Sequence, residues 1–189
     1  MKNIFKRSAI SSLVLATAFV GNADCEEGRI EFGDGDDRAS WSAMTDRVMG
    51  GVSTGESEVA GGNLIFTGEV SLENNGGFSL VETTDGEFDF SGASAMRLRV
   101  KGDGRPYVLR LATDARHRGD RVQYGAGFET EEGEWTEVVV PFDEMTPSHH
   151  GETVDAPPLN LAGIEQIGVM TGGKDPGPFE LEIDWMQPE

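Results

Sequence analysis

Apolar and polar residues alternate with a period of two along several short segments of this chain. The clearest are residues 96–101, whose polar positions are basic, and residues 179–185, whose polar positions are acidic. Successive side chains of a strand point to opposite faces, so each segment predicts a strand with one buried and one solvated face. Further strands are predicted at residues 30–32, 57–59, 64–66, 78–82, 107–112, 124–130, 135–140 and 166–170.

The spacing of these segments predicts an all-β fold. Beyond the N-terminal region, no twelve-residue window carries an apolar stripe with helical period, and the strands recur about every ten residues. This pattern is typical of a two-sheet β-sandwich or jelly roll. Glycine-rich turns predict hairpins at residues 61–63 and 102–104, and residues 143–161, stiffened by three prolines, are expected to form the longest loop.

Residues 1–23 have the pattern of an export signal. Three basic residues precede an apolar run from Ala9 to Val20, and Gly21-Asn22-Ala23 is a small-residue cleavage site. The run is too short for a stable membrane anchor. A mitochondrial presequence is the alternative, but it would be amphipathic and rich in arginine. We therefore expect a periplasmic or secreted protein, with residues 24–189 forming a single β-sandwich domain and Cys25 unable to form an internal disulfide.

The chain is strongly acidic, with a formal net charge of −19. Such a surface repels nucleic acid and anionic lipid headgroups, which argues against both as partners. We expect a monomer that does not insert stably in a membrane once the signal is removed.

The least regular stretch runs from Trp41 to Gly55. Val48, Met49 and Val52 are apolar, but Gly50-Gly51 between them would interrupt a helix or a regular strand. We expect a buried or half-buried loop, held by these apolar side chains, with its main chain bonded by short polar side chains.

This stretch also carries a resemblance. Residues 46–53, Asp-Arg-Val-Met-Gly-Gly-Val-Ser, resemble the signature of the complex I intermediate-associated protein 30 family. Residues 74–78, 102–107, 135–142 and 181–185 agree with the family in the same order, so the resemblance covers roughly residues 30–186. It implies a galactose-binding-like jelly-roll sandwich and a role in assembling respiratory complex I, here in a bacterial, exported member. Mitochondrial members work in the matrix, so an exported member would need a different client.

The residues give no sign of catalysis. The chain has three histidines, no Gly-x-Ser-x-Gly elbow and no phosphate-binding loop, so we expect no enzyme activity and no cofactor. His149 and His150 are adjacent, and one strand or turn would point them apart, so no metal site is expected. The acidic cluster at residues 33–37 is interpreted as a solvated turn rather than a calcium loop.

Six residues are candidates for ligand binding because polar or aromatic side chains on loops can meet at one end of a sandwich: Trp41, Asp46, Arg47, Asn74, Asn75 and His149. Each also has a structural interpretation. The asparagines suit turns, Asp46 can cap main-chain amides or pair with Arg47, and Trp41 can be a core anchor.

Three functions remain open. The first is a non-catalytic binding or assembly domain that supports a respiratory or envelope protein complex through a protein client. The alternative is a carbohydrate-binding module of the cell envelope, which would bind a glycan. The third is an enzyme whose site is not visible from sequence.

Overall fold

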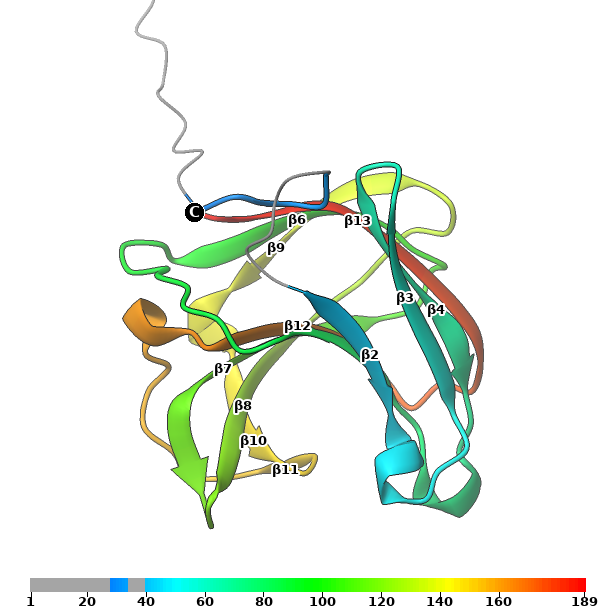
Figure 1. Cartoon of the computed structure of the whole chain (residues 1–189), viewed down its shortest axis with the longest axis horizontal. Helices are drawn as coiled ribbons and strands as arrows, with labels where there is room; N and C mark the ends of the chain where they lie inside the picture. Colours follow the sequence, from blue (N-terminus) through cyan, green and yellow to red (C-terminus); the bar gives the residue numbers. More distant parts are fainter. Residues whose placement is uncertain (1–27, 34–39) are drawn as a thin grey trace, which may run out of the picture.

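The computed structural model describes residues 28–33 and 40–189. These residues form two antiparallel β-sheets and four short 3-10 helices, and they include no α-helix (Figure 1). The all-β expectation is confirmed. No helix among the described residues is long and apolar enough to cross a membrane. The predicted signal at residues 1–23 and most of the acidic cluster, residues 34–37, lie outside the described residues.

The first sheet, sheet A, has six strands in the order β3-β4-β13-β6-β9, with β1 paired to β13. Its strands are β1 (Ile30–Glu31), β3 (Thr54–Ala60), β4 (Asn63–Val70), β6 (Ala95–Lys101), β9 (Trp135–Pro141) and β13 (Gly177–Pro188). Strand β13 is the longest. It pairs with β4 through Gly177–Ile183 and with β6 through Glu182–Pro188, so it lies in the middle of the sheet.

The second sheet, sheet B, has seven strands in the order β11-β10-β8-β7-β12-β5-β2. They are β2 (Trp41–Thr45), β5 (Ser79–Thr83), β7 (Tyr107–His117), β8 (Asp120–Phe128), β10 (Thr146–His149), β11 (Glu152–Thr153) and β12 (Gln166–Thr171). Figure 1 shows this sheet as an arch that opens away from sheet A, so its outer face is concave.

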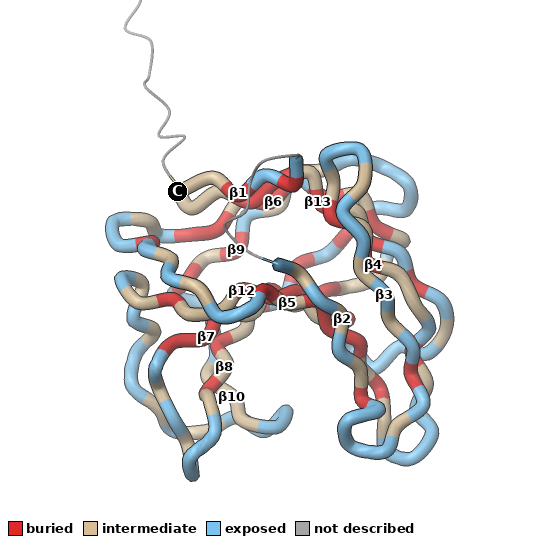
Figure 2. The backbone as a smooth tube through the Cα atoms, in the orientation of Figure 1, coloured by how far each residue is buried: buried red, intermediate tan, exposed pale blue. Residues whose placement is uncertain are grey.

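The core lies between the inner faces of the two sheets. The apolar positions of the predicted alternation supply it, and Leu98, Leu109, Ile167 and Leu181 are all fully buried there. Burying one such side chain stabilises the fold by about 1.5–3 kcal/mol. Figure 2 shows the buried residues concentrated along the strands, while most of the connections are exposed. The alternation therefore identified the inner face of most strands correctly.

Two hairpin predictions had different outcomes. Gly61 and Gly62 connect β3 to β4 as expected, and both have the positive φ angles of a tight hairpin turn. The hairpin expected at Gly102–Gly104 is wrong, because β6 belongs to sheet A and β7 to sheet B. This connection crosses between the sheets, and Thr130 secures it by accepting from the Gly104 amide and donating to the Arg105 carbonyl.

Two segments are more regular than the sequence predicted. Residues 143–161 are not one long loop, because they contain β10 and β11, which extend sheet B beyond β8. Residues 41–45, expected to be irregular, form edge strand β2, which pairs with β5 along five residues. Strands β2 and β10 are short and lie at or beside an edge of sheet B. Their residues are at most partly buried, so the contrast between apolar and polar positions is weak.

Candidate functional site

The signature loop, residues 46–53, is organised by one buried carboxylate. Residues Asp46–Met49 form the 3-10 helix η1, which Thr45 caps and Gly50 ends in a left-handed conformation. Asp46 accepts hydrogen bonds from the amides of Ser53 at 3.0 Å, Gly77 at 2.7 Å and Phe78 at 3.4 Å, and from the Ser53 hydroxyl. One side chain therefore joins the loop after β2 to the loop before β5.

Burial alone would raise the pKa of Asp46, but the hydrogen bonds from Ser53, Gly77 and Phe78 outweigh it and hold the pKa below its ordinary value. Gly51 and Gly76 make the close approach possible, since a Cβ on either would overlap the Asp46 carboxylate. The expected capping role of Asp46 is what the structure shows.

Three other predicted site residues lie on the same two loops. The Arg47 side chain is exposed and makes no hydrogen bond or ion pair with any residue the structure describes. Asn74 and Asn75 have positive φ angles, and the Asn74 amide donates to the Gly50 carbonyl at 3.2 Å. Turn geometry accounts for both asparagines, while Arg47 is left free to contact a partner.

The expectation that apolar side chains hold this loop is wrong. Val48 is 67% exposed and Met49 62% exposed, because the Asp46 hydrogen bonds, not an apolar core, fix the backbone. Five of the eight exposed large apolar residues of the described chain lie on the segments that converge at Asp46. We call these five the apolar rim: Met44, Val48, Met49, Val52 and Leu72.

The concave face of sheet B begins beside this rim. The register places one outward-facing row across six strands: Ser42, Glu82, Gly168, Arg110, Gly125 and Thr146. A neighbouring row contains Met44, Leu80, Met170, Val108 and Gly127. The concave face therefore has charged groups near its centre and apolar groups on the side toward the rim.

Arg110 is the central charged group of this face. Its guanidinium has one hydrogen-bond acceptor among the described residues, the Met170 sulfur at 3.8 Å, which is a weak acceptor. Burial lowers the pKa of Arg110, and Glu82 opposes that effect. Burial likewise raises the pKa of Glu82, opposed by Arg110 and Arg121. The two side chains attract each other across Gly168 without forming a close ion pair, so Arg110 keeps donors for a ligand.

Trp41 does not lie on the concave face. It pairs in register with Thr83, which is buried, and its ring packs edge-on against Phe32 with centroids 5.5 Å apart. Trp41 therefore packs against the core, as its structural interpretation predicted.

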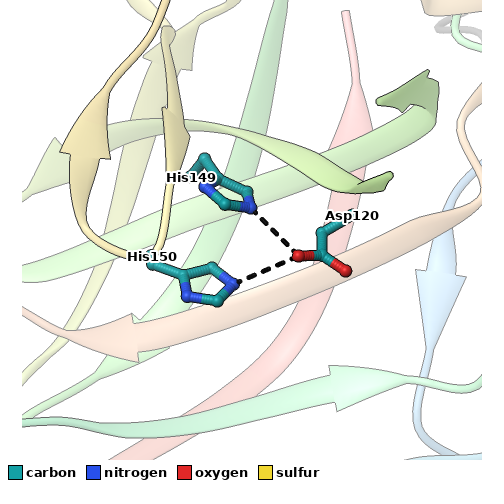
Figure 3. A group of neighbouring side chains, drawn as sticks. All are labelled: Asp120, His149 and His150. Carbon is teal, nitrogen blue, oxygen red and sulfur yellow. Dashed lines mark hydrogen bonds and ion pairs between the residues drawn. The ribbon is translucent and has the colours of Figure 1, made fainter. Parts of the chain in front are cut away.

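His149 lies far from the other candidates, because four strands of sheet B separate β10 from β2. The expectation that His149 and His150 point apart is wrong. Their rings stack with centroids 4.1 Å apart, and both Nε2 atoms face Asp120 (Figure 3). The reason is the positive φ of His150, which reverses the chain at that residue. These three side chains are the only group of the described residues with the spacing of a metal site.

Sequence reasoning missed Arg110, Glu82 and Asp120. Glu82 and Arg110 fall within two predicted strands, residues 78–82 and 107–112, and no pattern in the sequence marked either as a site residue. A usable signal was present in Gly125, Gly127 and Gly168, since glycine within a strand marks a place where another group approaches closely. Asp120 lies 29 residues from His149 in the sequence, and no local pattern joins them.

Solved structures of similar shape include carbohydrate-binding modules. The family 11 module of a cellulosomal cellulase of Clostridium thermocellum has a TM-score of 0.60 at 12% identity, over 84% of this chain and 93% of the module. A family 30 module has a TM-score of 0.52 at 13% identity, over 85% of this chain and 99% of the module. At this identity the likeness shows the fold alone, and it confirms the galactose-binding-like β-sandwich.

Sequence comparison identifies the family. A Mus musculus protein named complex I intermediate-associated protein 30, mitochondrial, is 35% identical over 102 residues, which are 52% of this chain and 31% of the mouse protein. The match thus spans less than a third of that relative's length. Residues 30–183 match the family described as complex I intermediate-associated protein 30. The match includes the signature loop, β13 as far as Ile183 and both sheets, and the chain belongs to the complex I intermediate-associated protein 30 family.

Proposed function

We propose that this protein is a non-catalytic binding domain that supports the assembly of a protein complex by holding a polypeptide segment of a client. The segment lies on the concave face of sheet B and contacts the apolar rim. Family membership supports an assembly role, since the mouse relative is named for its association with an intermediate of complex I.

The observation that carries the proposal is the exposure of the apolar rim. Met49 and Val48 are more than 60% exposed, although the loop that bears them is tightly bonded through Asp46. A fixed loop with exposed apolar side chains costs free energy in water and gains it when another surface covers those side chains. A Val side chain forms no hydrogen bond and a Met thioether is only a weak acceptor, so these side chains suit the apolar side chains of a protein better than the hydroxyls of a sugar.

Arg110 supplies the polar part of the same recognition. A guanidinium presents five N–H donors, and here the only acceptor for them among the described residues is a thioether sulfur. Main-chain carbonyls or a carboxylate of the client would satisfy these donors with charge-assisted hydrogen bonds. The nearby Glu82 would bind a basic or amide group of the same segment. An extended segment lying across the strands would therefore meet polar contacts at the centre and apolar contacts at the rim.

A glycan on the same face is the second candidate. The row through Ser42, Glu82 and Arg110 offers hydroxyl, carboxylate and guanidinium groups, which can bond to sugar hydroxyls. However, no aromatic side chain stands in the two outward-facing rows of sheet B described above, so the rows lack a ring on which a sugar could stack. Because the rows lack such a ring, we favour a protein client over a glycan as the ligand of this face.

The identity of the client depends on where the protein works. The mouse relative is named as mitochondrial, whereas residues 1–23 of this chain predict export. Cell fractionation with antibody detection decides between the two. Recovery from the cytoplasm or the matrix would favour a complex I intermediate as client, and recovery from the periplasm or medium would favour an envelope complex.

Site-specific photocrosslinking in the host cell tests the proposal. A photoreactive amino acid is placed at Met49, and the matched control is placed at Val139, which is 43% exposed on the outer face of sheet A. We expect a discrete crosslinked protein from position 49 and none from position 139. A second variant, Met49→Asp, should abolish capture by a probe at Val48 while leaving the melting temperature unchanged.

Two results would overturn the proposal. One is equal crosslinking from positions 49 and 139, which would mean that the rim has no preferred partner. The other is saturable binding of a glycan from a panel to the purified protein, lost in Arg110→Gln and unaffected by Met49→Asp. That second result would make the carbohydrate-binding function correct.

A further inference from the structure

All three histidines of the chain gather at the tips of two neighbouring hairpins. The β7–β8 hairpin turns at Arg118-Gly119 and the β10–β11 hairpin turns at His150-Gly151. Both central residues of each turn have positive φ angles, as in the tight type I′ turns that fix hairpin geometry. The two turns are held side by side because β8 and β10 are paired strands of sheet B.

The side chains on these turns converge on one point. The Oδ2 atom of Asp120 lies 3.3 Å from Nε2 of His149 and 3.7 Å from Nε2 of His150. The three ligand atoms all lie within 4.8 Å of one another. Figure 3 shows both imidazole rings directed at the same carboxylate from one side. The ring of His117 lies next to that of His149, with centroids 5.1 Å apart.

We propose that Asp120, His149 and His150 bind a divalent transition-metal ion of the zinc type. Ligands bound at about 2.0–2.2 Å around a tetrahedral ion stand roughly 3.4 Å apart, close to the spacings found here. Two imidazoles and one carboxylate form a donor set suited to zinc, nickel or copper. Calcium and magnesium prefer oxygen ligands only and would not select this set.

A purely structural role does not account for the arrangement. A histidine–aspartate hydrogen bond needs one imidazole, and His149, whose side chain is 15% exposed, already provides it. His150 is 65% exposed and gains little from burial, yet its Nε2 faces the same carboxylate oxygen. Because β8 and β10 set the positions of both turns, the metal would meet ligands already close to their bound geometry.

Three protein ligands leave a tetrahedral ion with one open position. Asp120 and His150 are each 65% exposed at the side chain, so no strand within residues 28–33 and 40–189 covers the cluster. Water or a donor atom from a bound partner would complete the coordination. The ion would also clip the two hairpins together at the edge of sheet B opposite to β2. This site is independent of the client-binding proposal, since it shares no residue with the concave face or the rim.

Zinc titration of the full chain tests the site. The parent carries Cys25→Ser, which removes the one thiol of the chain, and it is freed of metal with a chelator before calorimetry with zinc chloride. Asp120→Asn, His149→Ala and His150→Ala are compared with Asp143→Asn, an exposed aspartate outside the cluster. Cobalt is substituted in parallel, because its visible spectrum reports coordination directly. Melting curves without metal show that each variant is folded.

We expect one zinc ion per chain and a loss of affinity of about tenfold or more in each of the three cluster variants. Asp143→Asn should bind as the parent does, and cobalt should give a tetrahedral spectrum that His150→Ala abolishes. Because His150 is exposed, that variant should fold even if His149→Ala does not. Dissociation constants above about 100 µM, or stoichiometric binding that survives His150→Ala, would overturn the proposal.

Discussion

Replacing Asp46 with alanine should destabilise the fold more than any other change to the signature loop. The carboxylate accepts from three main-chain amides and one hydroxyl, and it joins loops that are 31 residues apart in the sequence. The substitution removes every one of these acceptors and leaves a small void between Gly51 and Gly76.

The magnitude follows from the donors that lose their partner. A buried donor left unpaired costs about 1–3 kcal/mol, and the Ser53 and Gly77 amides are two such donors. The Phe78 amide, at 3.4 Å, contributes little, and the Ser53 hydroxyl can turn fully toward the Ser71 carbonyl at 3.3 Å. We therefore expect Asp46→Ala to lower the free energy of unfolding by about 3–5 kcal/mol. Asp46→Asn keeps one acceptor oxygen and should lower it by about 2 kcal/mol.

Urea unfolding monitored by tryptophan fluorescence measures the effect, with Asp143→Ala as the control for loss of an exposed carboxylate. The control should change the free energy of unfolding by less than about 0.5 kcal/mol. A change of less than about 1 kcal/mol in Asp46→Ala would refute the reasoning. It would mean that water replaces the carboxylate as the acceptor for these amides.

The dependence on pH gives a second readout of the same carboxylate. Hydrogen bonds hold the folded-state pKa of Asp46 below the ordinary value of 3.8. The carboxylate therefore contributes its full stability above that value and loses it as the pH falls through the lower, folded-state pKa. The difference in unfolding free energy between the wild type and Asp46→Asn should be constant above about pH 5 and shrink in stronger acid. A difference that grows on acidification would contradict this sign.

Three further changes have clear expectations. Gly51→Ala should destabilise the fold by about 1–3 kcal/mol in the same urea assay, because the new Cβ overlaps the Asp46 carboxylate. Thr130→Val should cost about 1–2 kcal/mol in that assay, because it removes both hydrogen bonds that hold the connection between β6 and β7. Arg110→Gln should weaken client capture by about tenfold without changing the melting temperature, whereas Arg99→Gln on sheet A should leave capture unchanged.

Much of the fold was predictable from the sequence because many of its strands have one face in the core and one face in contact with water. In β6 and β13 the apolar positions fill the core and the charged positions face water, so a period of two identifies both the strand and its inner face. Strands β2, β10 and β11, at or beside the edges of sheet B, were missed because their burial is partial and gives no such contrast. Local pattern also could not say whether Gly102–Gly104 turns a hairpin or crosses between sheets, since that depends on pairing with distant strands.

The candidate site was predictable only in part for the same physical reason. Asp46 and Asn74 were identified because a carboxylate or an asparagine beside glycines has a local structural meaning. The convergence of Asp120 with His149 and His150 depends on the pairing of β8 with β10, and the row through Arg110 depends on the register of six strands. Such contacts arise from the assembled sheet. The strand glycines Gly125, Gly127 and Gly168 could indicate a close approach, but not which residues meet there.

The structure divides the signature loop into two parts with different physical requirements. Asp46, Gly51 and Ser53 are needed for folding, because the buried carboxylate bonds Ser53 and leaves no room for a Cβ at position 51. Val48 and Met49 are not needed for folding, since most of each side chain is exposed and an alanine at either position removes little buried surface. Any binding role of the loop therefore belongs to Val48 and Met49. Stability and client capture should separate along this division: Asp46→Ala should lose both, while Met49→Ala should keep the first and weaken the second. If Met49→Ala instead lowers the melting temperature, the rim is a structural surface and the proposed binding role fails.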